Sequence, residues 1–169
     1  MNVERLSVGS LNIDAPDIAV KPENKALVSA ALKLLSRRDY PRSGFITKLA
    51  SAEFDKADVE AAADWCQAQG FLNETRFAES TSRRLGTKYG SQRVAHTLRQ
   101  KGVSEDQVSA AISTLKESES DRATAIWTRK FGRVAESSDE KSKQIRYLQT
   151  RGFSFAIIKN VIAGEIDDP

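Results

Sequence analysis

Residues 80–104 read STSRRLGTKYGSQRVAHTLRQKGVS, a stretch with six fixed positive charges and no Asp or Glu. The positive residues are Arg83, Arg84, Lys88, Arg93, Arg99 and Lys101. Such a cluster creates a local positive potential that suits an anionic partner, such as nucleic acid or a protein bound to it. A basic run alone is equally compatible with a solvated helix face, so its meaning depends on the rest of the chain.

The apolar positions in and around this stretch recur at fixed distances along the chain. Two sets lie 49 positions apart, namely Tyr40, Ile46, Leu49, Phe54 and Val59 with Tyr89, Ala95, Leu98, Val103 and Val108. A third set lies 99 positions after the first and consists of Ile145, Leu148, Phe153 and Ile158. Phe131 stands in the place of the two tyrosines and is followed by eight extra residues, the polar run around 136–141. Repeated matches of this kind indicate an internal repeat.

Each copy has the spacing of three helices, and a tight turn joins the last two helices of a copy. Gly102 and Gly152 occupy this turn in copies two and three, where a left-handed backbone conformation is required. Glu53 occupies the same place in copy one, so this copy must either turn differently or bear backbone strain. Ser104 followed by Gln107 predicts a capping box at the start of the last helix of copy two.

No convincing strand pattern follows residue 26, so the predicted fold class is all-α. Asp55 is the predicted N-cap of the third helix. Each unit is too small to bury its apolar stripe alone, and we therefore expect three tandem three-helix repeats stacked into an elongated, curved solenoid. The expected division is an N-terminal tail, expected to be mobile, then three repeats and an acidic C-terminal tail, over residues 1–25, 26–72, 73–118, 119–164 and 165–169.

The 169-residue chain has a net charge of +3, and its positive charge is concentrated in the last two repeats. Cys66 is the only cysteine, which excludes an intramolecular disulfide. No apolar run approaches the ~20 residues of a membrane span, and no secretory signal pattern precedes the repeats. We therefore expect a cytoplasmic protein that does not associate with a membrane.

Motifs for catalysis are absent from the sequence. There is no glycine-rich phosphate loop followed by Lys-Ser/Thr, no nucleophile elbow around any serine, and no His/Cys cluster of the kind that holds zinc. The only histidine, His96, is expected to make an exposed polar contact. The sequence therefore predicts no catalytic residue, no metal and no cofactor, and a protein that is not an enzyme.

Helical spacing over residues 91–101 places Val94 and Leu98 toward the core and the positive groups outward, where they are not used for internal pairing. Two other functions stay open on these residues. The turn at Gly102 is also typical of a helix-turn-helix transcriptional regulator, although the candidate reading helix, expected over residues 105–114, carries no Arg or Lys and offers only Gln107 to base edges. A helical scaffold that binds another acidic protein is the second alternative.

Four stretches of the chain resemble the RecX family of bacterial regulators of the RecA recombinase. They are ALKLLSRRDYPRSGFITKL (31–49), WCQAQGFLNETRFA (65–78), RRLGTKYGSQRVAHTLRQKGV (83–103), and RKFG (129–132) with YLQTRGF (147–153). Together they span nearly the whole chain, from residue 26 to residue 162. The chain departs from the family's pattern at 43–45 and at 52–53, both in copy one.

The resemblance implies the same fold of tandem three-helix repeats. It also implies a non-enzymatic regulator, expected to be a monomer, that binds along the groove of the RecA–DNA filament and lowers RecA's recombinase, ATPase and coprotease activities. The implied partners are the RecA filament, single-stranded DNA and double-stranded DNA. Carried onto this chain, the groups expected to contact the filament or DNA are basic residues of the matched stretches: Arg83, Arg84, Lys88, Arg93, Arg99, Lys101, Arg146 and Arg151.

Overall fold

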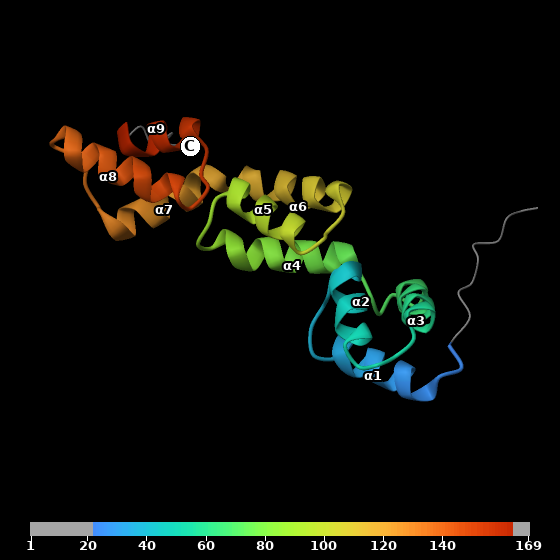
Figure 1. Cartoon of the computed structure of the whole chain (residues 1–169). Coiled ribbons are helices and arrows are strands. Elements are labelled where there is room, and N and C mark those ends of the chain that lie inside the picture. Colours follow the sequence, from blue (N-terminus) through green and yellow to red (C-terminus); the bar gives the residue numbers. More distant parts are fainter. Residues whose placement is uncertain (1–21, 164–169) are drawn as a thin grey trace, which may run out of the picture.

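The computed structural model describes residues 22–163, which form nine helices and no strand (Figure 1). Unit 1 consists of α1 (Lys25–Leu35), α2 (Arg42–Ala50) and α3 (Lys56–Ala68). Unit 2 consists of α4 (Glu74–Gly86), α5 (Ser91–Gln100) and α6 (Glu105–Glu117). Unit 3 consists of α7 (Glu119–Lys130), α8 (Ser138–Gln149) and α9 (Phe155–Ala163). The three units follow one another along an elongated, curved path, so the predicted fold class is confirmed.

The expectation of a mobile N-terminal tail falls mostly on residues 1–21, and that of an acidic C-terminal tail on residues 165–169. Both segments lie outside the described residues.

Side-chain caps fix where several of the helices begin. Five N-cap side chains accept a backbone N–H from the first turn of the helix that follows: Asn24, Asp55, Asn73, Ser137 and Ser154. The predicted cap at Asp55 is therefore confirmed. The capping box predicted at Ser104 is wrong, because this hydroxyl donates instead to Glu74 Oε2 at 2.8 Å. That hydrogen bond joins the start of α4 to the start of α6 within unit 2.

Each unit has its own apolar core. The repeat-equivalent leucines Leu49, Leu98 and Leu148 are 1%, 0% and 0% exposed, which confirms the register of the repeat at these positions. The repeat-equivalent aromatic residues Tyr40, Tyr89 and Phe131 are partly buried and pack against the cores of units 1, 2 and 3 respectively.

The described residues form no apolar cluster that spans two units, since each of the three clusters draws on the helices of one unit and the loops beside them. Our reason for expecting a solenoid, that each unit must share its apolar surface with a neighbour, is therefore wrong. Thirteen-residue helices such as α3, α4 and α6 give a three-helix unit enough apolar surface to close a small core by itself. Neighbouring units consequently meet through polar groups and backbone.

The tight turn between the last two helices of a unit has the same left-handed backbone in all three units. Its central residue has φ of +75° at Gly102 and +80° at Gly152. Glu53 has φ of +63° at the equivalent place. Copy one therefore makes the same turn as the others and bears the strain that a side chain brings to this conformation.

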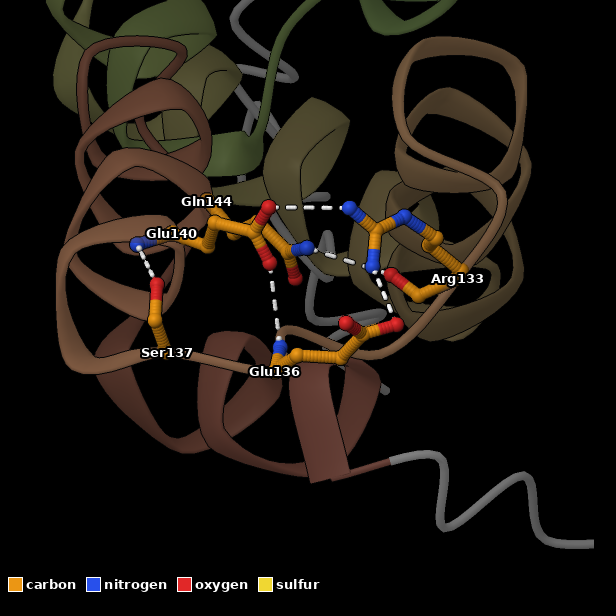
Figure 2. A network of polar contacts seen from close by, with 5 residues as sticks. All are labelled: Arg133, Glu136, Ser137, Glu140 and Gln144. Carbon is orange, nitrogen blue, oxygen red and sulfur yellow. Dashed lines mark hydrogen bonds and ion pairs between the residues drawn. The ribbon is translucent and has the colours of Figure 1, made fainter.

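The extra residues of unit 3 lie partly in an ordered loop before α8 and partly in the first turn of α8 itself (Figure 2). The guanidinium of Arg133 donates to Glu136 Oε1 at 2.7 Å and to Glu140 Oε1 at 2.8 Å. The backbone N–H of Glu136 donates to Glu140 Oε2, and this hydrogen bond is the main reason that the pKa of the Glu140 carboxyl is lowered. Gln144 joins the loop to the core, because its amide donates to Arg133 O and accepts from the indole N–H of Trp127.

The core register yields a stability prediction for the two equivalent leucines. Leu98→Ala and Leu148→Ala should each lower the free energy of unfolding by about 2–5 kcal/mol, the cost of deleting a buried Leu side chain. Urea denaturation followed by circular dichroism measures this loss. Unfolding of Leu98→Ala at the wild-type urea concentration would contradict the repeat alignment at its best-supported position.

The strained turn of unit 1 yields a prediction of opposite sign. Glu53→Gly should raise the free energy of unfolding by about 0.5–1 kcal/mol, because glycine removes the left-handed penalty but loses more backbone entropy on folding. The matched control is Ala52→Gly, one residue earlier and outside the left-handed region, which should lower stability by a similar amount. A lower urea midpoint for Glu53→Gly than for wild type would show that Glu53 stabilises the turn through its side chain.

Candidate functional site

A cleft of about 1190 Å³ separates unit 1 from unit 2 and is lined mainly by polar and basic side chains. Its five cationic lining residues are Arg38, Lys48, Arg84, Arg99 and Lys101. Asp39 is the acidic residue among the described lining residues, and its carboxylate accepts from Arg76 at 2.7 Å. The cleft therefore has a strong excess of positive charge on both of its walls.

The folding of the local helices explains where four of these cations lie. Lys48, Arg84 and Arg99 occupy the last turns of α2, α4 and α5, and Lys101 is the C-cap of α5. Cations are favoured at helix C-termini because they complement the partial negative charge there. Three helix ends that converge on the cleft thus bring their positive charges together.

The five cations are not equally available to a ligand. Arg99 is held by a two-pronged interaction with Glu105, in which Nε donates to Oε2 at 2.8 Å. This pairing raises the pKa of Arg99 and lowers that of Glu105. The guanidinium of Arg38 lies 4.6 Å from the ring centre of Tyr40. Arg38, Lys48, Arg84 and Lys101 therefore have no ion-pair partner within the described part of the chain.

Two further candidates from the sequence, Arg93 and Arg151, meet at the boundary between units 2 and 3. Arg93 donates to the carbonyl of Thr150 at 2.7 Å and lies over the ring of Tyr89. Arg151 lies over the ring of Tyr147 at 3.7 Å. Our expectation that the basic groups of residues 91–101 are free of internal pairing is therefore wrong for Arg93 and for Arg99. Arg93 is exposed, but its guanidinium is held in place.

The remaining candidates lie apart from the cleft. Arg83 lines a separate groove of about 530 Å³ between α4 and α6. Lys88 and Arg146 are exposed, on the loop after α4 and on α8 respectively. Of the eight residues predicted from the sequence, the structure thus brings three into one cleft and two into one junction.

The sequence-based set missed Arg38 and Lys48, the two cations on the unit 1 wall. Unit 1 has no net charge over residues 26–72, which hides the fact that its acidic residues other than Asp39 lie outside the cleft. Arg42, for example, pairs with Glu60 and Asp64 of α3. The position of Lys48 in the last turn of α2, like that of Arg99 in α5, is the signal that could have identified it.

Residues 22–163 contain no set of three His, Cys, Asp or Glu side chains able to hold a metal ion. Within the same range, no helix is both long and apolar enough to cross a membrane. Burial raises the pKa of the Cys66 thiol to about 11.

The chain is similar to proteins of one family. Residues 73–112 match the model of the second three-helix domain of RecX, and residues 117–162 match that of the third. Regulatory protein RecX of Chromobacterium violaceum is 38% identical over 146 residues, which cover 86% of this chain and 95% of that protein. Regulatory protein RecX of Ralstonia nicotianae is 35% identical over 147 residues, covering 87% of this chain and 92% of that protein.

Solved structures support the fold. The crystal structure of RecX from Lactobacillus salivarius superposes with a TM-score of 0.73 at 19% identity, covering 82% of this chain and 94% of that one. A second crystal structure of regulatory protein RecX has a TM-score of 0.69 at 22% identity, covering 80% of this chain and 71% of that one. With sequence relatives above 30% identity along most of its length and two matching domain models, the chain belongs to the RecX family of regulatory proteins.

Proposed function

We propose that this protein binds the RecA–DNA filament and inhibits the recombinase, ATPase and coprotease activities of RecA. The observation that carries the proposal is the basic cleft between units 1 and 2, with five cations and one paired carboxylate among its described lining residues. In this proposal the protein is a cytoplasmic monomer without catalytic activity of its own. Its effect on RecA comes from occupying an anionic surface of the filament.

The chemistry of the cleft favours phosphate groups as its ligand. Arg38 and Arg84 offer planar, multi-donor guanidinium groups, while Lys48 and Lys101 offer compact ammonium charges. Such groups neutralise phosphates and position a nucleic-acid backbone without reading its sequence. Tyr40 and Phe77 also line the cleft but pack against the cores of their own units. The cleft is therefore suited to a polyanion of any sequence.

Further cations lie at the boundary between units 2 and 3 and beyond it. Arg93 and Arg151 lie there, and exposed Arg146 follows on α8. A polyanion bound in the cleft could continue toward these residues, because all three units lie along one path (Figure 1). Units 2 and 3 carry the net positive charge of the chain, which supports an extended anionic partner such as a filament.

A helix-turn-helix regulator is the weaker candidate. Its reading helix would be α6, whose first turn contains Glu105 and Asp106 and whose one cation, Lys116, lies in the last turn. Acidic groups at the start of a helix repel the phosphates that flank the major groove. The cations lie instead at the ends of α2, α4 and α5, which favours backbone binding over base reading.

Charge reversal tests the cleft. The double variant Lys48→Glu/Lys101→Glu, with one change on each wall, should weaken inhibition of the RecA ATPase by at least about tenfold, because attraction to an anionic surface becomes repulsion. Inhibition is measured on RecA with single-stranded DNA as a function of the protein concentration. Both residues are exposed, so circular dichroism should show an unchanged fold.

The matched control is Lys33→Glu/Lys159→Glu, which makes the same change in net charge at exposed residues of α1 and α9 outside the cleft. Its inhibition of the RecA ATPase should weaken by less than about threefold, because only the long-range attraction to the filament changes and salt screens that attraction. Equal losses in the two double variants would mean that net charge, and not the cleft, governs inhibition.

Binding to free single-stranded DNA should depend steeply on salt. Neutralisation of four phosphates by Arg38, Lys48, Arg84 and Lys101 predicts a log–log slope of about −3, at roughly −0.7 per phosphate. Fluorescence anisotropy of labelled oligonucleotides measures the slope, and oligonucleotides of different sequence should bind within a few-fold of one another. A slope near zero, or a strong preference for one duplex sequence, would contradict phosphate binding in the cleft.

A further inference from the structure

The two boundaries between units are built on the same plan but differ in their contacts. At each boundary, the left-handed turn of one unit lies against the start of the second helix of the preceding unit. Gly102 lies at Ser43 in the first boundary, and Gly152 lies at Arg93 in the second. A direct comparison of the two boundaries is therefore possible, residue by residue.

Backbone meets backbone at the boundary between units 2 and 3. The N–H of Gly90 donates to Arg151 O at 2.9 Å, and the N–H of Gln92 donates to Gly152 O at 3.2 Å. A Cβ atom on Gly90 would lie 2.3 Å from Gly152 O, closer than any real side chain approaches. Glycine at both positions is thus what permits the close contact.

Buried polar groups reinforce this second boundary. The Glu119 side chain, 2% exposed, accepts from the Ser91 N–H at 2.6 Å and from the Ser91 hydroxyl at 2.8 Å. The guanidinium of Arg122 donates to three backbone carbonyls of unit 2: Gly86 at the end of α4, Tyr89 in the following loop, and Leu115 in the last turn of α6. Separating units 2 and 3 would leave a carboxylate and several carbonyls without these partners, which is costly for buried groups.

The first boundary lacks the equivalent contacts. Pro41 stands in the place of Gly90 and has no N–H to donate to the turn. The Ser43 hydroxyl takes over, at 3.2 Å from Lys101 O and 3.4 Å from Gly102 O, which is weak geometry for a hydroxyl donor. The ion pair between Arg76 and Asp39 is partly exposed and of a kind that contributes about 0–1 kcal/mol.

The chain segment that connects two units is also tighter at the second boundary than at the first. Ser118 is at once the C-cap of α6 and the N-cap of α7, and these two helices pack against each other. Between units 1 and 2, Leu72 is buried in the unit 1 core while the next residue, Asn73, caps α4. The peptide bond between Leu72 and Asn73 thus joins two separately packed bodies directly.

Like charges face one another across the cleft at this weaker boundary. Arg38 and Lys48 belong to the unit 1 wall, and Arg84 and Lys101 belong to the unit 2 wall. Their repulsion favours an open cleft in the free protein, and a bound polyanion removes that repulsion. Because the first boundary has few contacts, unit 1 can move toward unit 2 when a polyanion binds.

We propose that unit 1 turns about the connection at Leu72–Asn73 and closes the basic cleft onto its polyanionic partner, while units 2 and 3 move as one rigid body. The closure rests on the proposed function of the cleft. The difference in rigidity between the two boundaries does not, and it can be measured in the protein alone.

Spin-label distances measured by electron paramagnetic resonance test both parts. One pair of labels, on Ser51→Cys and Gln100→Cys, spans the cleft, and both residues are exposed and uncharged. The matched pair, on Ser109→Cys of α6 and Ala156→Cys of α9, spans the second boundary at exposed positions. Cys66 is buried and its thiol pKa is raised to about 11, so it should not compete for the label.

In the free protein, the distribution of label-to-label distances across the cleft should be about twice as broad as the distribution for the matched pair, as expected of two bodies with few mutual contacts. A short oligothymidylate should shift the cleft distance to smaller values and narrow its distribution, and it should leave the matched pair unchanged. Equal widths in the free protein would overturn the hinge. A cleft distance that the oligonucleotide does not shorten, although it binds, would overturn the closure.

A reversible disulfide provides a functional test on the full chain. A Cβ on Gly102 would lie 3.1 Å from Ser43 Cβ, slightly inside the usual separation of about 3.5–4.5 Å for a disulfide. Glu53, at the equivalent turn position, shows that this left-handed site accepts a side chain. The variant Ser43→Cys/Gly102→Cys should therefore lock the first boundary in its described, open arrangement when oxidised.

The oxidised variant should bind oligothymidylate about tenfold more weakly than the same variant after reduction, because the locked cleft cannot close. Equal affinity in the two redox states, with the disulfide shown to be formed, would overturn the closure; should the disulfide not form, the spin-label distances decide. Failure of the wild-type protein to bind the oligonucleotide would instead refute the proposed phosphate binding, and the widths in the free protein would still decide whether the first boundary is a hinge.

Discussion

The left-handed turn between the last two helices of each unit is the constraint on which the architecture depends. It folds the third helix back over the apolar face of the second, which closes the three-helix core. The same turn directs backbone carbonyls outward, and in units 2 and 3 these carbonyls lie against the preceding unit. A single local conformation thus determines both how a unit folds and how it joins its neighbour.

Helix stability and ligand attraction use the same side chains in this protein. Lys48, Arg84 and Arg99 each lie in the last turn of a helix, where a cation stabilises the helix dipole. Because the repeat brings those helix ends together, their charges add up to one positive cleft. A charged surface of this kind can arise from ordinary helix termini without any residue placed solely for binding.

The register of the repeat could be predicted from the sequence because it rests on local spacing. Buried positions such as Leu98 and Leu148 follow from apolar periodicity alone. For Glu53 the sequence left a different turn or a strained one as alternatives, and its φ of +63° decides for strain. The contacts that the cations make could not be predicted in the same way. Arg93 is held by the carbonyl of Thr150, 57 residues away in the sequence, and helical periodicity contains no information about such a contact.

One residue explains why two boundaries with a common plan differ in strength. Proline at position 41 is the N-cap residue of α2, has no N–H to donate, and packs in a buried position. That choice removes the backbone donor that Gly90 supplies to Arg151 O in the second boundary. Arg42 stands at the position equivalent to Ser91, which donates to the buried Glu119 in the second boundary. Arg42 pairs instead with α3 of its own unit. Pro41 thus removes a backbone donor, and Arg42 makes its ion pairs within unit 1. Units 1 and 2 are therefore joined by the Ser43 hydroxyl and by the exposed contacts of Arg76 with Asp39 and Phe71 O, without the backbone and buried contacts of the second boundary.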